Sequence, residues 1–140
     1  MKKKKIAVII ARGGSKRIPK KNIKNFLGKP IIEIVIRTIK SSKIFDEIII
    51  STDNFSIAKI AEKNKIKVPF KRPKSLANDY ADGLSVMKHA VNTFNPGNSN
   101  NNIFCCIYPT SVFMTKRDLI SSYREFNKSK PSFLFAATSF

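Results

Sequence analysis

The sequence predicts an α/β protein with an open, mostly parallel sheet, and three observations support this class. Short apolar runs, typical of strands covered on both faces, occur at Ile6–Ala11, Glu47–Ser51 and Ile103–Tyr108. Segments with apolar residues at helical spacing separate these runs along the chain. A polar or glycine-rich turn follows each run, at the end of the strand where such sheets bind ligands. We therefore expect one domain over residues 1–140, with right-handed crossovers between parallel strands.

Helices are expected between the first strands. Pro30 suits the start of a helix over Ile31–Ser41, because the first helical turn does not need the N–H that proline lacks. The polar cluster Ser51-Thr52-Asp53-Asn54 is suited to cap a second helix at about Phe55–Asn64. These two segments would provide the crossovers that parallel neighbouring strands require.

The second half of the chain continues the alternation. In order, we expect a strand-like piece at Lys67–Phe70, a helix at about Gly83–Phe94, a loop at Asn95–Asn102, an amphipathic helix at Lys116–Lys128 and the start of a strand at Ser132–Ala137. The apolar face of the Gly83–Phe94 helix is predicted from Leu84, Met87, Ala90 and Val91.

The charge of the chain favours an anionic partner. The formal net charge is +18, from 27 basic and 9 acidic residues, which raises the question of nucleic acid. The lysines are spread along the whole chain, and no helix-turn-helix, zinc or aromatic-basic strand signature accompanies them. We therefore favour a solvated basic surface with an anionic small-molecule substrate, and keep a basic nucleic-acid-binding protein as the less favoured alternative.

Cysteine usage and hydropathy indicate a cytoplasmic protein without a membrane segment. The two cysteines, Cys105 and Cys106, are adjacent, which excludes a disulfide framework. Neighbouring strand residues point to opposite faces, so both are expected to pack as small apolar residues. The apolar run at Ile6–Ala11 is too short for a signal peptide, and no run is long enough to cross a bilayer.

The most informative motif is Ala11-Arg12-Gly13-Gly14-Ser15-Lys16, which directly follows the first strand. The glycines allow backbone N–H groups to approach an anion, and the Arg and Lys side chains neutralise its charge. The spacing is neither that of a Walker P-loop nor that of a dinucleotide fingerprint. The motif therefore predicts a phosphate site of a third kind, with an ordinary solvated basic turn as the alternative.

Several further motifs, in order and correctly spaced, resemble the acylneuraminate cytidylyltransferases. They are Lys21-Asn22, Gly28-Lys29-Pro30, Ser51-Thr52-Asp53, Val68-Pro69-Phe70, Arg72-Pro73, Leu76, Asp79 and Pro109-Thr110-Ser111. The segment Cys105-Cys106-Ile107-Tyr108-Pro109-Thr110 is similar to the pseudaminic acid cytidylyltransferases of this family. The resemblance implies a Rossmann-like nucleotidyltransferase sheet. It also implies that CTP and a nine-carbon 2-keto sugar acid react to give a CMP-sugar and pyrophosphate.

The resemblance implies three groups of site residues. Arg12 and Lys16 would hold the triphosphate and act in catalysis. The nucleotide would be bound by Ala11, Arg12, Gly13, Gly14, Ser15, Lys16, Lys21, Asn22, Ser51, Thr52, Asp53 and Arg72. The sugar acid would be bound by Tyr108, Thr110 and Asp79. Two other interpretations stay open: Ser51–Asp53 also cap the following helix, and Tyr108 is a half-buried core aromatic.

The resemblance further implies Mg²⁺ as cofactor and a homodimer for a complete enzyme. Asp53 is a candidate for holding the metal through water, but the metal ligands stay unassigned. Family members continue beyond the position of Phe140, so we expect a nucleotidyltransferase domain that is truncated at its C-terminus, with the missing part supplying the metal carboxylates and the dimer contact. A catalytically silent CTP-binding fragment is therefore the alternative to an active enzyme.

Overall fold

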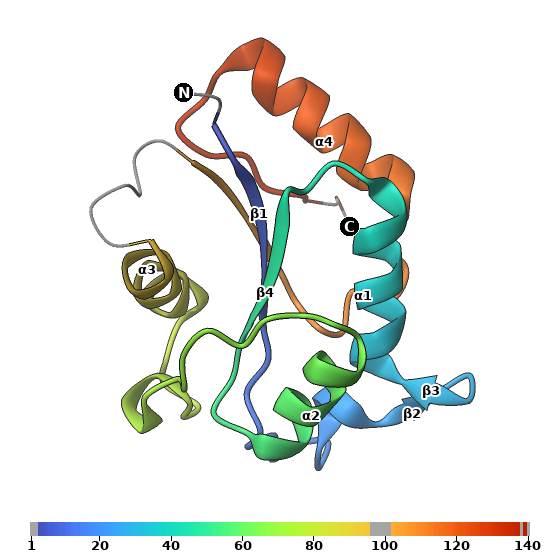
Figure 1. Cartoon of the computed structure of the whole chain (residues 1–140), viewed down its shortest axis with the longest axis vertical. Helices are drawn as coiled ribbons and strands as arrows, with labels where there is room; N and C mark the ends of the chain where they lie inside the picture. Colours follow the sequence, from blue (N-terminus) through green and yellow to red (C-terminus); the bar gives the residue numbers. More distant parts are fainter. Residues whose placement is uncertain (1–2, 96–101, 138, 140) are drawn as a thin grey trace.

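The computed structural model describes residues 3–95, 102–137 and 139, and its centre is a three-stranded parallel sheet (Figure 1). The strands are β1 (Lys5–Ile10), β4 (Glu47–Ser51) and β5 (Ile103–Ile107), in the order β4-β1-β5. Both neighbours run parallel to β1, with Val8 opposite Ile49 on one side and Cys106 on the other. The predicted α/β class with a parallel sheet is confirmed.

Helices cover both faces of this sheet, as Figure 1 shows. On one face lie α1 (Ile31–Ser42), α2 (Phe55–Lys63) and α4 (Lys116–Ser129), and on the other lies α3 (Gly83–Phe94). The shorter elements are the 3-10 helices η1 (Lys21–Ile23) and η2 (Lys74–Leu76) and the hairpin strands β2 (Asn25–Phe26) and β3 (Lys29–Pro30).

The alternation of β1 side chains explains these two layers. Ala7 and Ile9 belong to the core under α1, and Ile6 and Val8 belong to the core under α3. Successive strand residues point to opposite faces, so an unbroken apolar strand provides both cores at once. None of the helices in the described ranges combines the length and apolar character that crossing a bilayer requires.

Helix α2 is capped by Asn54 and not by the three residues before it. The Oδ1 atom of Asn54 accepts a hydrogen bond from the N–H of Ile57 at 3.1 Å. The predicted cap cluster Ser51-Thr52-Asp53-Asn54 is therefore confirmed at Asn54, and the narrower assignment of the cap to Ser51–Asp53 is wrong. Ser51 is still the last residue of β4, so the chain reaches the cap position only at Asn54.

The predicted apolar face of α3 is wrong at Leu84. Leu84 is 80% exposed, whereas Val86 and Ala90 are buried against the sheet. Residues two apart on a helix lie about 200° apart around its axis. The face that carries Val86 and Ala90 therefore turns Leu84 toward solvent.

The expected strand start at Ser132–Ala137 is also wrong, because this segment contains no strand. No strand of the described residues pairs with it, and an extended segment becomes a strand only through a ladder of backbone hydrogen bonds. Phe133 and Phe135 are exposed, and their rings stack with centroids 6.2 Å apart. Residues 132–137 therefore carry the alternating apolar pattern of a strand, but no strand of the described residues pairs with them.

Two connecting segments also differ from a simple strand-and-loop alternation. The strand-like piece at Lys67–Phe70 forms only one isolated parallel bridge with β4, from Ile49 to Lys67, and a second bridge joins Thr52 to Lys71 just beyond the two segments. The loop expected at Asn95–Asn102 falls mainly on residues 96–101, which lie outside the described residues.

Candidate functional site

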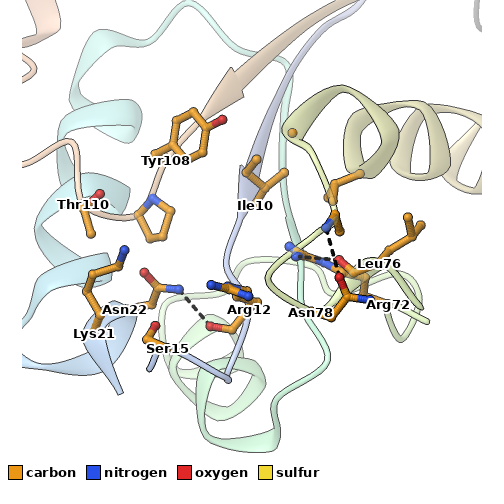
Figure 2. Close-up of a pocket in the computed structure, with 14 residues that line it drawn as sticks. Ile10, Arg12, Ser15, Lys21, Asn22, Arg72, Leu76, Asn78, Tyr108 and Thr110 are labelled. Atoms are coloured by element: carbon orange, nitrogen blue, oxygen red, sulfur yellow. Dashed lines mark hydrogen bonds between the residues drawn. The ribbon is translucent and has the colours of Figure 1, made fainter. Parts of the chain in front are cut away.

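A pocket of about 190 Å³ lies at the carboxyl ends of β1 and β5 (Figure 2). The chain leaves β1 toward β4 on one side, and β5 lies on the other side. Open α/β sheets bind ligands at this kind of switch point, where connections diverge to opposite sides. The lining comprises Ile10, Arg12, Ser15, Lys21, Asn22, Arg72, Leu76, Asn78, Ala81, Gly83, Val86, Tyr108, Pro109 and Thr110.

The structure brings many of the predicted site residues to this pocket. The predicted residues that line it are Arg12, Ser15, Lys21, Asn22, Arg72, Tyr108 and Thr110. The predicted residues outside its lining are Ala11, Gly13, Gly14, Lys16, Ser51, Thr52, Asp53 and Asp79. Three cationic side chains from different parts of the chain therefore face one hollow, which suits an anionic ligand.

The phosphate loop, which we define as Arg12–Lys16, is fixed to the turn that follows β4. The N–H of Gly13 donates to Oδ1 of Asp53 at 2.9 Å, and Nδ2 of Asn22 donates to the carbonyl oxygen of Arg12 at 2.8 Å. Asn22 is buried. Gly13, Asp53 and Asn22 thus hold the backbone that presents Arg12 to the pocket.

Arg72 is a buried cation whose guanidinium is held by the end of β4. Its Nε donates to Oγ of Ser51 at 3.0 Å, and its Nη2 donates to the carbonyl oxygen of Ser51. The whole residue is only 4% exposed. Burial lowers the pKa of Arg72, and the carboxylate of Asp53 opposes that shift. Guanidinium groups nevertheless stay protonated in proteins, so Arg72 contributes a fixed positive charge to the pocket.

Asp79 pairs with the phosphate loop instead of lining the pocket. Its Oδ1 lies 2.7 Å from Nη2 of Arg12, and its Oδ2 lies 2.8 Å from Nζ of Lys16. Hydrogen bonds from Lys16, the larger cause, and from Arg12 hold the pKa of Asp79 below its ordinary value. The carboxylate therefore stays ionised at neutral pH and lies against the cations that the sequence assigns to a triphosphate.

Tyr108 lies at the rim of the pocket, and its 55% exposure is too high for the core aromatic that the sequence left open. The hydroxyl group approaches the start of α3, where a Cβ on Gly83 would lie 2.7 Å from Oη. Figure 2 shows Tyr108 and Thr110 on the same side of the pocket. The small residue at position 83 therefore makes room for the Tyr108 hydroxyl.

Two further residues of the pocket lining, Asn78 and Gly83, belong to none of the site motifs in the sequence. The Oδ1 of Asn78 accepts hydrogen bonds from the N–H groups of Tyr80 and Ala81, at 2.9 and 3.0 Å. An asparagine a few residues before a helix cap is a turn signal. That signal predicts a turn, but it carries no information on which strand end the turn would cover.

The acidic residues at the site do not form a metal centre. Within residues 3–95, 102–137 and 139, no three His, Cys, Asp or Glu side chains gather closely enough to hold an ion. Asp53 accepts from the Gly13 N–H, and Asp79 is paired with two cations. The described residues thus contain no all-protein metal cage. Mg²⁺ is usually held by one or two carboxylates together with substrate phosphates, so the expected cofactor stays a prediction.

Of the two cysteines in β5, Cys105 is packed as the sequence predicted and Cys106 is not. Cys105 packs against the core under α1, as expected, but Cys106 is exposed, and the expectation that it packs as an apolar residue is wrong. Burial raises the pKa of Cys105 to about 11. The surrounding protein also partly desolvates the more exposed Cys106 thiol and raises its pKa, and the charge of Arg72 opposes this shift. Both thiols therefore stay protonated at neutral pH.

We expect both thiols to react slowly with iodoacetamide at pH 8. The thiolate is the reactive form, and a pKa near 11 leaves Cys105 with only a trace of thiolate at that pH. Alkylation of Cys105 should be at least about tenfold slower than that of a free cysteine, and Cys106 should react first. Peptide mapping by mass spectrometry measures both rates, with the urea-unfolded chain as control. Rapid labelling of Cys105 in the folded chain would contradict this assignment.

Comparison with protein families gives a match over nearly the whole chain. The family model described as cytidylyltransferase matches residues 6–138. The pseudaminic acid cytidylyltransferase of Campylobacter jejuni subsp. jejuni serotype O:2 is 42% identical over 137 residues, which cover 98% of this chain and 59% of that protein. The N-acylneuraminate cytidylyltransferase of Escherichia coli O18:K1:H7 is 32% identical over 124 residues, which cover 89% of this chain and 28% of that protein. The chain thus spans less than two thirds of these relatives.

A solved structure supports the fold independently of close sequence similarity. The structure of CMP:2-keto-3-deoxy-manno-octonic acid synthetase complexed with CTP aligns with a TM-score of 0.75 at 20% identity. The alignment covers 91% of this chain and 48% of that one. At this identity the comparison shows that the two proteins share a fold.

Proposed function

The chain belongs to the cytidylyltransferase family, and from this premise we propose that it binds CTP and transfers the cytidylyl group to pseudaminic acid or a related nonulosonic acid. The observation that carries the proposal is the cationic pocket at the switch point of the sheet, lined by Arg12, Lys21 and Arg72. Its place and charge suit a nucleoside triphosphate, and the relatives named above suggest which one. The homodimer, the cytoplasmic location and the single domain stay predictions within this proposal.

The proposed reaction is a substitution at the α-phosphorus of CTP. The anomeric hydroxyl oxygen of the sugar acid forms a bond to that phosphorus and loses its proton to solvent. The bond between the α-phosphorus and the oxygen that bridges it to the β-phosphorus breaks, and pyrophosphate leaves with that oxygen. Phosphoryl transfer depends mainly on positioning and charge stabilisation. The protein therefore needs cations where the leaving pyrophosphate gains charge.

The phosphate loop supplies these groups in the proposed mechanism. Arg12 and Lys16 neutralise the β- and γ-phosphates and stabilise the charge that develops on the leaving group. The Oγ of Ser15 is buried and has no hydrogen-bond partner in the described part of the chain. Because Ser15 also lines the pocket, its hydroxyl is available to donate to a phosphate oxygen. We assign no step to a metal.

Residues from different parts of the pocket lining would contact the two substrates in this proposal. Lys21, Asn22 and Arg72 would contact the nucleotide, and Tyr108 and Thr110, which follow β5, would contact the sugar acid (Figure 2). The fixed guanidinium of Arg72 and the amide of Asn22 are suited to recognise carbonyl and hydroxyl groups of a nucleoside.

We expect the chain to bind CTP at least about tenfold more tightly than ATP or UTP, because a site built to hydrogen-bond one base leaves polar groups unpaired with another. Isothermal titration calorimetry of the three nucleotides measures this preference. A pyrophosphate-release assay with CTP, Mg²⁺ and pseudaminic acid then separates an active enzyme from a silent CTP-binding fragment. Equal affinity for all three nucleotides would refute the proposed recognition of CTP.

A further inference from the structure

The carboxylate of Asp79 lies between two side chains of the phosphate loop. One of its oxygens is 2.7 Å from the Arg12 guanidinium, and the other is 2.8 Å from the Lys16 ammonium. Each oxygen thus faces a different cation. The two ion pairs tie the segment before α3 to the loop after β1, across a large separation in sequence.

We propose that Asp79 is a positioning residue of the phosphate site, which occupies the anion position between Arg12 and Lys16 and leaves it when a triphosphate binds. The identity of the ligand rests on the proposed function, whereas the geometry rests on the two ion pairs. The sequence suggested a different role for Asp79, a contact with the sugar acid. Its observed contacts are instead with Arg12 and Lys16 of the phosphate loop.

Electrostatics makes the displacement necessary. The pKa of Asp79 lies below its ordinary value because Lys16 and Arg12 hydrogen-bond to its carboxylate, so the group is negatively charged at neutral pH. Two negative groups within a few ångströms of each other disfavour each other's charged form. Asp79 and a triphosphate therefore cannot share the same two cations, and binding of the polyanion requires the carboxylate to move.

The ion pairs are weak enough for a ligand to replace them. The side chain of Lys16 is 85% exposed and that of Asp79 is 34% exposed, and solvent-exposed pairs contribute little free energy. Residues 77–82 contain neither helix nor strand, so Asp79 can leave without the loss of a regular element. The side chain of Arg12 is 30% exposed, so its pair with Asp79 is the less exposed of the two.

The test compares binding of inorganic tripolyphosphate to the wild-type chain and to Asp79→Asn. Calorimetry at low ionic strength, without divalent cations, measures both dissociation constants. We expect Asp79→Asn to bind tripolyphosphate about threefold to tenfold more tightly, because the ligand no longer displaces a carboxylate. A second comparison introduces Asp79→Asn into a chain that already carries Lys16→Met. In that background Asp79→Asn should tighten tripolyphosphate binding less than it does in the wild-type chain, because the carboxylate acts partly through Lys16.

Glu62→Gln is the matched control, because it removes one negative charge from an exposed position on α2 that does not line the pocket. A gain in Asp79→Asn that exceeds the change in Glu62→Gln supports the proposal. An equal change in both variants, weaker binding in Asp79→Asn, or no binding by either variant overturns it. Failure of the proposed function is a separate result: the wild-type chain would then show no preference for CTP over ATP and UTP in calorimetry.

Discussion

Replacing Arg12 with alanine is expected to lower kcat/KM for CTP by about 100-fold to 1,000-fold, the usual cost of removing one group that stabilises charge in a transition state. Arg12 lines the pocket, and its guanidinium reaches the position that Asp79 now occupies. Its charge is therefore placed where a leaving pyrophosphate would become more negative. Both kcat and the affinity for CTP should fall, because the ground-state triphosphate is also an anion.

Arg17→Ala is the matched control for this experiment. Arg17 carries the same charge five residues further along, is exposed and does not line the pocket. Its replacement changes the net charge equally but removes no group from the site. Pyrophosphate release and CTP calorimetry on the two variants measure the effects. Similar losses in both would mean that Arg12 acts through the general positive field of the protein.

The sequence predicted the framework of this fold well, because the framework depends on local patterns. The bounds of β4 and α3 coincide with the predicted Glu47–Ser51 and Gly83–Phe94. In each case an apolar pattern ends at a polar residue that starts or stops the element. The meeting of strand ends at one pocket also followed from the parallel topology, since the turns after β1 and β5 must lie at the same edge.

The contacts within the site were less predictable, because they join segments that are distant in sequence. No local pattern shows that Asp79 pairs with Arg12, or that the Arg72 guanidinium is buried against Ser51. Both depend on how the segment between α2 and α3 folds back over the strand ends. The failed strand at Ser132–Ala137 has a related cause, since an alternating apolar pattern does not specify a neighbouring strand.

Replacing Gly13 with alanine is expected to destabilise the chain by about 2–4 kcal/mol, from overpacking and from a lost helix cap. A Cβ at this position would lie 2.5 Å from Nδ2, 2.8 Å from Cβ and 2.9 Å from Cγ of Asn54. Rotation of the amide relieves the first clash but not the clash with the Asn54 Cβ. The phosphate loop or the start of α2 must therefore shift, and either movement disturbs the hydrogen bond from the Gly13 N–H to Asp53.

Gly14→Ala provides the control, because no atom lies within 4 Å of a Cβ built at that position. Neither glycine has a positive φ, so alanine causes no backbone strain at either site, and the two variants differ in space alone. Urea unfolding should show a lower midpoint for Gly13→Ala at an unchanged m-value, and little change or a gain of up to about 1 kcal/mol for Gly14→Ala. Equal stabilities would refute the close contact with Asn54.

A double-mutant cycle tests whether the cost of Gly13→Ala comes from Asn54 itself. Glycine at position 54 removes every clashing atom and remains an acceptable cap residue, so Asn54→Gly alone should cost only a few tenths of a kcal/mol. Gly13→Ala should then be much less harmful in the Asn54→Gly background, with a coupling energy of about 1–3 kcal/mol. Such a rescue would show that the phosphate loop and the cap of α2 compete for one space. It would follow that glycine is required at position 13 by packing, before any phosphate is bound.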